Sequence, residues 1–125
     1  MIRKLLLIAC AGGIGTLARY GLSGFIQRLI GGVFPWGTVV VNICGCLLAG
    51  LLWAALEERY PIPGDVRAMV FIGFMGAFTT FSTYMLESGN LIQDGEWMRA
   101  AGNMLLQNSA GITALFTGLA LGKYF

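Results

Sequence analysis

Histidine is absent from the sequence, and charged residues are scarce. Lys, Arg, Asp and Glu make up only 11% of the 125 residues, and the net charge is +2. Without histidine the chain lacks the commonest general base and a common metal ligand. A soluble domain usually carries about a quarter charged residues, so this chain has too few to cover a surface that faces water. The small, scattered net charge also gives no support for a nucleic-acid partner.

Cysteine is rare, and no known catalytic set is present. The sequence contains no Ser-His-Asp set, phosphate-binding loop or cluster of metal ligands. Cys10, Cys44 and Cys46 all lie in apolar stretches, and on a helix Cys44 and Cys46 face different directions. Buried packing explains these cysteines better than a disulfide or a metal site. The sequence therefore predicts that the protein is not an enzyme.

Long apolar stretches dominate the chain instead. Hydrophobic residues make up 57% of it, and a helix that crosses a bilayer needs about 20 residues. The sequence predicts an all-α membrane protein with a single transmembrane domain and helices at about residues 5–26, 38–56, 68–88 and 100–121. The first span resembles a signal peptide, but we expect it to be retained because three more spans follow it.

The charges that flank the spans give only a slight preference for one orientation. Five basic residues lie at the termini and in the second loop, and two lie on the opposite side: Arg3, Lys4, Arg59, Arg67 and Lys123 against Arg28 and Arg99. This excess favours an N-terminus inside the cell, but it is small enough to permit insertion in both orientations. With four spans, both termini are expected on one side of the membrane.

The third span contains the stretch GFMGAFTTFST (residues 73–83), which is unusual for an apolar helix. Its two glycines each weaken a helix by about 1 kcal/mol relative to alanine. Four hydroxyl residues fall within five positions: Thr79, Thr80, Ser82 and Thr83. Bonding of a hydroxyl to a carbonyl one turn earlier explains one or two of them better than four. Irregular backbone at membrane depth persists only where protein or water surrounds it, so we expect this helix to be broken mid-membrane and to line an ion site.

Two polar residues in the first two spans each have two interpretations. Asn42 is the only strongly polar side chain of the second span, and it either bonds to a neighbouring helix or lines a pore. Arg19 lies about 14 residues into the first span, near 20 Å along a helix. It either extends to the far interface or acts as a fixed charge near a pore mouth.

The fourth span carries two polar stripes on different faces of the expected helix. One consists of Asn103, Gln107 and Gly111, and the other of Ser109, Thr113 and Thr117. At least one stripe must face protein or water. Four helices fill their own core with side chains, so a single copy leaves little room for a polar path. The surplus of polar residues therefore predicts an oligomer.

These motifs resemble the Fluc fluoride channels, also called CrcB proteins. The resemblance covers essentially the whole chain and rests on GGIGTLARY (residues 12–20), GTVVVNICG (residues 37–45) and GFMGAFTTFST. The first motif alone is weak, whereas the third in combination with the second is highly specific. The resemblance implies an antiparallel, dual-topology homodimer with two fluoride pathways between the protomers. It also implies a structural sodium ion at the dimer centre, held by the main-chain carbonyls of Gly76 and Thr79.

The resemblance also implies roles for single residues. Family pore residues match Asn42 and Phe81, and the polar track of the fourth span falls on Asn103 and Gln107. Two positions depart from the family pattern: Tyr84 replaces the second phenylalanine of a pair, and Gln107 stands where a hydroxyl residue is usual. The full predicted pathway is Asn42, Thr80, Phe81, Ser82, Thr83, Tyr84, Asn103 and Gln107, with Arg19 and Glu87 as charges at the pore mouth.

The chemistry of these residues agrees with what the resemblance implies. Fluoride is small and strongly hydrated, so a path through a bilayer must replace its water by donors such as amide N–H, hydroxyl O–H and the positive edge of an aromatic ring. Donors in place of fixed lysines bind the ion weakly enough to release it. The prediction is passive fluoride export across the inner membrane of a bacterium or archaeon. The alternatives are a small dual-topology multidrug antiporter and a membrane scaffold that transports nothing.

Overall fold

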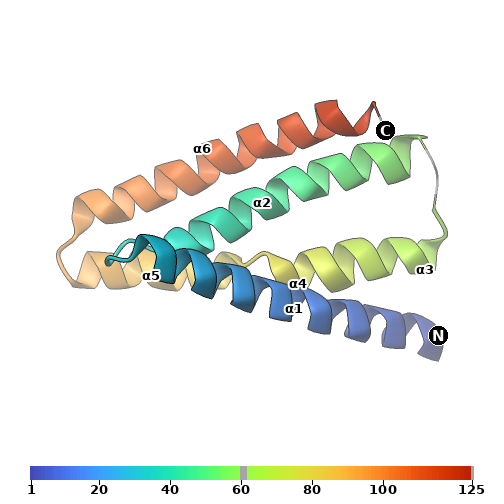
Figure 1. Cartoon of the computed structure of the whole chain (residues 1–125), viewed down its shortest axis with the longest axis horizontal. Helices are drawn as coiled ribbons and strands as arrows, with labels where there is room; N and C mark the ends of the chain where they lie inside the picture. The colour runs from blue at the N-terminus through green and yellow to red at the C-terminus, as the bar shows by residue number, and fades with distance from the viewer. Residues whose placement is uncertain (60–61, 125) are drawn as a thin grey trace.

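The chain forms a bundle of four long helical segments that run alternately up and down (Figure 1). The computed structural model describes residues 1–59 and 62–124. The first segment is α1 (Ile2–Ile30), the second is α2 (Trp36–Trp53) with the π-helical η1 (Ala54–Arg59), and the fourth is α6 (Trp97–Gly122). The third consists of α3 (Gly64–Arg67), the π-helical η2 (Ala68–Met75), α4 (Gly76–Phe78) and α5 (Phe81–Gln93).

Each segment is long and apolar enough to cross a membrane. These candidate spans are Ile2–Ile30, Trp36–Leu56, Gly64–Gln93 and Trp97–Gly122. The described residues contain no strand, which confirms the predicted all-α class, and the four helices of membrane length agree with the number of predicted spans. The helices extend past the predicted ranges because apolar sequence marks only the part inside lipid, whereas backbone hydrogen bonding continues into the polar ends.

Helical hydrogen bonding stops within the third segment, between α4 and α5. Thr79 has φ −86° and ψ 159°, and Thr80 has φ −150° and ψ 116°, so both residues are extended. The interruption lies inside the stretch of residues 73–83, next to its glycines and hydroxyl residues. It separates the third segment into two helical halves with a short length of extended backbone between them (Figure 1).

Glycines bring the helices of the bundle close together. α2 and α6 lie side by side (Figure 1), and a Cβ on Gly118 would fall on the carbonyl oxygen of Leu47. On the other side of the bundle, a Cβ on Gly15 of α1 would fall on the carbonyl oxygen of Phe74. Such close approach of backbones is how helices associate in lipid, where no hydrophobic force drives them together.

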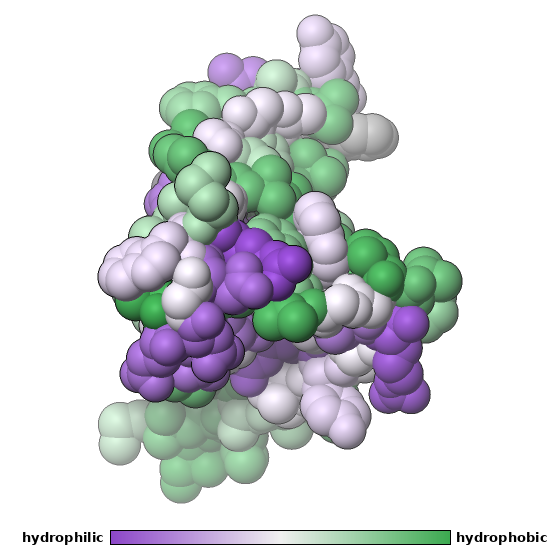
Figure 2. Space-filling view, turned by 90° about the vertical axis from the view of Figure 1, so that its left-hand side faces the viewer, coloured by the Kyte–Doolittle hydropathy of each residue, from purple (hydrophilic) through white to green (hydrophobic). Residues whose placement is uncertain are grey.

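The outer surface is largely apolar, with polar side chains gathered at the ends. Large exposed hydrophobic side chains occur on all four segments, among them Leu17, Leu48, Ile72 and Phe116. Figure 2 views the end that carries the α1–α2 and α5–α6 connections, where hydrophilic side chains cluster. The exposed polar residues there include Arg28, Gln93, Asp94 and Arg99. Both termini lie at the opposite end (Figure 1), as the four predicted spans require.

Candidate functional site

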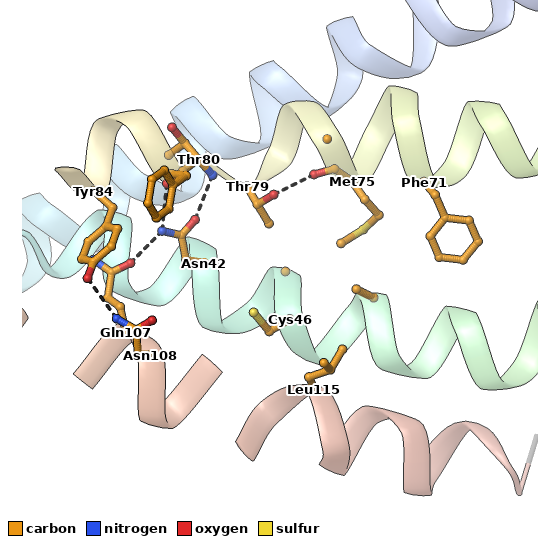
Figure 3. A pocket seen from close by; sticks show the side chains of 14 residues that line it. Asn42, Cys46, Phe71, Met75, Thr79, Thr80, Tyr84, Gln107, Asn108 and Leu115 are labelled. Carbon is orange, nitrogen blue, oxygen red and sulfur yellow. Dashed lines mark hydrogen bonds between the residues drawn. The ribbon is translucent and has the colours of Figure 1, made fainter. Parts of the chain in front are cut away.

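Asn42 on α2 holds the extended backbone between α4 and α5. Its Oδ1 accepts a hydrogen bond from the backbone N–H of Thr80 at 2.9 Å, and its Nδ2 donates to the carbonyl oxygen of Thr80 at 3.1 Å (Figure 3). The other Nδ2 hydrogen is donated to Oε1 of Gln107 at 2.7 Å. The side chain therefore satisfies both backbone polar groups of Thr80, and both of its own donor hydrogens are used within the same chain.

A chain of hydrogen-bonded side chains continues from Asn42 into the protein interior. Gln107 Nε2 donates to Asn103 Oδ1 at 2.9 Å, and Asn103 Nδ2 donates to Ser88 Oγ at 2.9 Å. Ser88 Oγ in turn donates to the carbonyl oxygen of Tyr84. Asn103 is fully buried and Gln107 is 8% exposed. Buried amides are stable only when their polar atoms are paired, so this series of hydrogen bonds fixes the orientation of the Asn42 amide.

The interruption removes the usual helical donors from carbonyls of the third segment, among them those of Gly76 and Thr79. In a continuous helix the N–H of Thr80 would bond to the carbonyl of Gly76, and that of Thr83 to the carbonyl of Thr79. Here Thr80 N donates to Asn42, and Thr83 N donates to Thr80 Oγ1 at 3.3 Å. Thr80 thereby caps α5 with its own hydroxyl. The carbonyl oxygens of Gly76 and Thr79 are left able to accept other partners.

Two hollows lie on either side of the contact between Asn42 and Thr80. The first, which we call the Asn108 hollow, has a volume of about 460 Å³. Its polar and aromatic lining includes Asn42, Thr80, Phe81, Tyr84, Gln107 and Asn108. The second, which we call the Arg19 hollow, has a volume of about 480 Å³ and is lined by Thr16, Arg19, Tyr20, Ser23, Thr80 and Thr83, among others. Thr80 is common to both hollows.

The aromatic pair predicted for the pathway borders the Asn108 hollow. The rings of Phe81 and Tyr84 lie edge to face, with centroids 5.7 Å apart. Phe81 is 72% exposed, whereas Tyr84 is 5% exposed. The hydroxyl oxygen of Tyr84 accepts a hydrogen bond from Asn108 Nδ2 at 3.0 Å (Figure 3). The ring of Phe81 therefore faces outwards, whereas that of Tyr84 is packed inside the bundle.

A carboxylate lies about two helical turns beyond the interruption. Glu87 of α5 is half-buried, and its Oε1 accepts a hydrogen bond from Thr38 Oγ1 at 2.7 Å. Its Oε2 is buried and has no hydrogen-bond partner within the part of the chain that the structure describes. Glu87 and Thr38 both line a third hollow, of about 250 Å³, near the end shown in Figure 2.

Comparison with known proteins shows the family to which the chain belongs. Residues 6–119 match the family model described as CrcB-like protein, Camphor Resistance (CrcB). The chain belongs to the CrcB family. The match covers the whole membrane bundle apart from its ends, so the family resemblance seen in the sequence is confirmed.

Curated relatives of this CrcB chain carry a functional name. The fluoride-specific ion channel FluC of Desulforapulum autotrophicum is 52% identical over 98% of both chains. Proteins of the same name from Nitrosococcus oceani and Solidesulfovibrio magneticus are 50% and 52% identical over the same share of both chains. These relatives are named as ion channels, which agrees with the prediction that the chain is not an enzyme. With four spans of membrane length, this CrcB chain is a multi-pass membrane protein.

The structure places the two polar stripes of the fourth span on different surfaces. Asn103, Gln107 and Gly111 are buried inside the bundle. Ser109, Thr113 and Thr117 are exposed, and each hydroxyl donates to the carbonyl one turn earlier. A hydroxyl bonded in this way adds little polarity to a surface that faces lipid. Of the predicted hydroxyls in the third segment, Thr79 bonds back to Met75 in the same manner at 3.0 Å.

Most of the predicted site residues lie around the Asn108 and Arg19 hollows. The first hollow collects Asn42, Thr80, Phe81, Tyr84 and Gln107, and the second collects Arg19, Thr80 and Thr83. Asn103 lies deeper, behind Gln107. Ser82 is exposed on the surface of the bundle and lines neither hollow. Glu87 lies apart, against Thr38.

Sequence reasoning missed three polar partners in this CrcB chain: Asn108, Thr38 and Ser88. Asn108 contacts Tyr84, Thr38 contacts Glu87, and Ser88 contacts Asn103. For Asn108 the sequence did indicate that a partner was needed, because it lies next to Gln107 on a membrane helix and a second amide there also needs a hydrogen-bond partner. Its partner lies 24 residues away in sequence, so the contact depends on how α5 and α6 pack.

Proposed function

We propose that this CrcB-family chain is a fluoride-selective channel through which fluoride leaves the cell down its gradient. The observation that carries the proposal is the identity of about half of all residues, over 98% of the chain, with relatives named fluoride-specific ion channels. The matched length includes the interrupted third segment and the polar residues around it. The proposed location is the inner membrane of a bacterium or archaeon.

The proposed pathway follows the two hollows past the interruption. Fluoride must exchange its hydration shell for donors, and a narrow path of such donors favours fluoride over the larger chloride. The edge of Phe81 presents partial positive charge, and Gln107 Nε2 keeps one hydrogen beyond the one donated to Asn103. Asn42 reaches the ion only by exchanging one of its present acceptors for it. Arg19, half-buried in its hollow, would raise the local anion concentration.

We further propose that the channel is an antiparallel homodimer with two pathways between the protomers. The weak charge bias of the sequence permits insertion in both orientations. Phe81 and Gly76, at the level of the interruption, are exposed on the protomer. An isologous interface would cover such residues and would bring the exposed ring of Phe81 against a pathway of the partner.

The carbonyl oxygens of Gly76 and Thr79 fit the proposed structural sodium ion. Both have lost the donors that a continuous helix would supply, because Thr80 N and Thr83 N bond elsewhere. Unwound backbone carbonyls are the usual ligands of sodium in membrane transport proteins. A bound sodium ion would supply positive charge that offsets anions nearby. The carbonyl oxygens of Gly76 and Thr79 would hold that ion, because the interruption leaves them without their helical donors.

Growth of a bacterial strain that lacks its own fluoride exporter tests the proposal. Expression of the full chain should restore growth in fluoride, and the Phe81→Ile variant should fail to restore it at equal expression. Failure of the unaltered chain to protect cells in which it is correctly inserted contradicts fluoride export. Uptake of a cationic drug driven by a pH gradient would instead favour the antiporter alternative.

A further inference from the structure

The hydroxyl of Tyr84 is held in one orientation by Asn108. Asn108 Nδ2 lies 2.7 Å from the carbonyl oxygen of Met104 and 3.0 Å from the hydroxyl oxygen of Tyr84. A backbone carbonyl can only accept, so the amide atom beside Met104 must be the nitrogen. The same nitrogen therefore donates to Tyr84, and both of its hydrogens are used. The Tyr84 oxygen acts as an acceptor in this contact.

That contact determines where the Tyr84 hydroxyl hydrogen can point. A phenolic hydrogen prefers the plane of the ring, on one of two sides of the oxygen. Since Asn108 approaches one side as a donor, the hydrogen must lie away from it. No described residue accepts this hydrogen. Tyr84 is only 5% exposed and borders the Asn108 hollow beside Phe81. An unused donor at such a depth is costly unless a ligand or water accepts from it.

We propose that the Tyr84 hydroxyl donates a hydrogen bond to fluoride in the Asn108 hollow, and that Asn108 is the positioning residue that aims it. The proposal rests on the proposed function and adds a donor that a phenylalanine at this position would lack. Phe81 and Tyr84 both line this hollow, and the edge of the Phe81 ring carries a partial positive charge that attracts an anion. Because Asn108 can only donate here, it prevents the hydroxyl from turning its oxygen towards the anion.

Fluoride efflux from liposomes that contain the full-length protein tests the two roles. Tyr84→Phe removes only the hydroxyl, and we expect it to lower the efflux rate by about five- to tenfold. Asn108→Ala should lower the rate by a similar factor, and the double variant should be no slower than Tyr84→Phe alone. Tyr124→Phe and Ser109→Ala, at exposed positions on the same chain, serve as matched controls and should conduct like the unaltered protein.

A spectroscopic readout separates hydrogen bonding from a structural effect. With 3-fluorotyrosine in place of Tyr84, the ¹⁹F resonance of the ring should shift as sodium fluoride is added and should stay unchanged with sodium chloride. Asn108→Ala should reduce that shift. If the ring resonance does not shift with fluoride in a protein that conducts, the proposal is wrong and water is the only acceptor of the Tyr84 hydroxyl hydrogen.

The outcomes for the two proposals are distinct. If the unaltered protein conducts fluoride and Tyr84→Phe conducts equally well, the hydroxyl has no part in transport and the inference is wrong, while the channel function stands. If the unaltered, folded protein passes no fluoride, the proposed function itself fails. Additive losses in the double variant would contradict the positioning role of Asn108.

Discussion

Asn42 supplies Thr80 with the two hydrogen bonds that the interrupted helix cannot. Its side-chain amide accepts from the N–H of Thr80 and donates to the C=O of the same residue, as a strand neighbour would. The amide of α2 thus compensates for the loss of helical bonding between α4 and α5. The sequence left two interpretations of Asn42 open, a bond to a neighbouring helix and a place in a pore lining. The structure shows the cross-helix bond, and this contact lies beside the proposed ion pathway.

Loss of the Asn42 amide should destabilise the protein. Asn42→Ala leaves the backbone groups of Thr80 and Oε1 of Gln107 unpaired, and we expect a loss of about 1–3 kcal/mol in the free energy of unfolding. Asn42→Asp should be no better, because a carboxylate would face two acceptors. Unfolding in a denaturing detergent measures the change, with the exposed Asn90→Ala as a control. Equal stability of the Asn42 and Asn90 variants would show that Asn42 does not hold the interruption.

The hydrogen bond between Thr38 and Glu87 leads to a second prediction about stability. Thr38→Val keeps the shape of the side chain but removes the donor to Glu87 Oε1, and Oε2 already lacks a described partner. We expect destabilisation by about 1–2 kcal/mol, since the carboxylate is half-buried. Thr38→Ser retains the donor and should be close to the unaltered protein. Addition of Glu87→Gln to the valine variant should recover part of the loss, and no recovery would mean that the charge is not the cause.

Two glycines of α6 should respond oppositely to alanine. A Cβ at Gly118 would lie 2.8 Å from the backbone nitrogen of Leu51 and would force α2 and α6 apart. Nothing lies within 4 Å of a Cβ at Gly102. Gly118→Ala should cost about 1–3 kcal/mol, whereas Gly102→Ala should be neutral or gain up to about 1 kcal/mol from helix propensity. Thermal unfolding of the two variants in the same detergent checks this order, and a reversed order would contradict the α2–α6 packing.

Phe81 should matter for transport more than for folding. Its ring is 72% exposed, so Phe81→Ile removes little from the core of the bundle. We expect fluoride efflux to fall by at least about tenfold, with thermal stability and oligomeric state unchanged. Phe116→Ile is the matched control, because Phe116 is 64% exposed on α6 and lines neither hollow. Full efflux through the Phe81 variant would remove this ring from the pathway.

Apolar length and local composition allowed much of the architecture to be predicted. Four apolar stretches predicted four spans, and the glycines and hydroxyls of residues 73–83 marked the region in which helical bonding stops at Thr79 and Thr80. These features are local, so sequence reports them directly. The π-helical turns of η1 and η2 left no sequence signal that distinguishes them from α-helix.

Partners of single polar side chains could not be predicted in the same way. Asn42 was singled out, but its contacts with Thr80 and Gln107 depend on the registers of α2, α5 and α6 together. The pairing of Asn108 with Tyr84 has the same origin. Which stripe of α6 faces inward was also open, because both stripes have helical spacing and only packing against α2 selects one.

Fluoride efflux from liposomes, followed with a fluoride electrode, tests the central claim most directly. Purified protein reconstituted with an outward fluoride gradient should release fluoride without ATP or a proton gradient, while the same vesicles retain chloride. Protein-free vesicles provide the background leak. Vesicles that hold their fluoride despite folded protein, or that release chloride as fast as fluoride, would contradict the account.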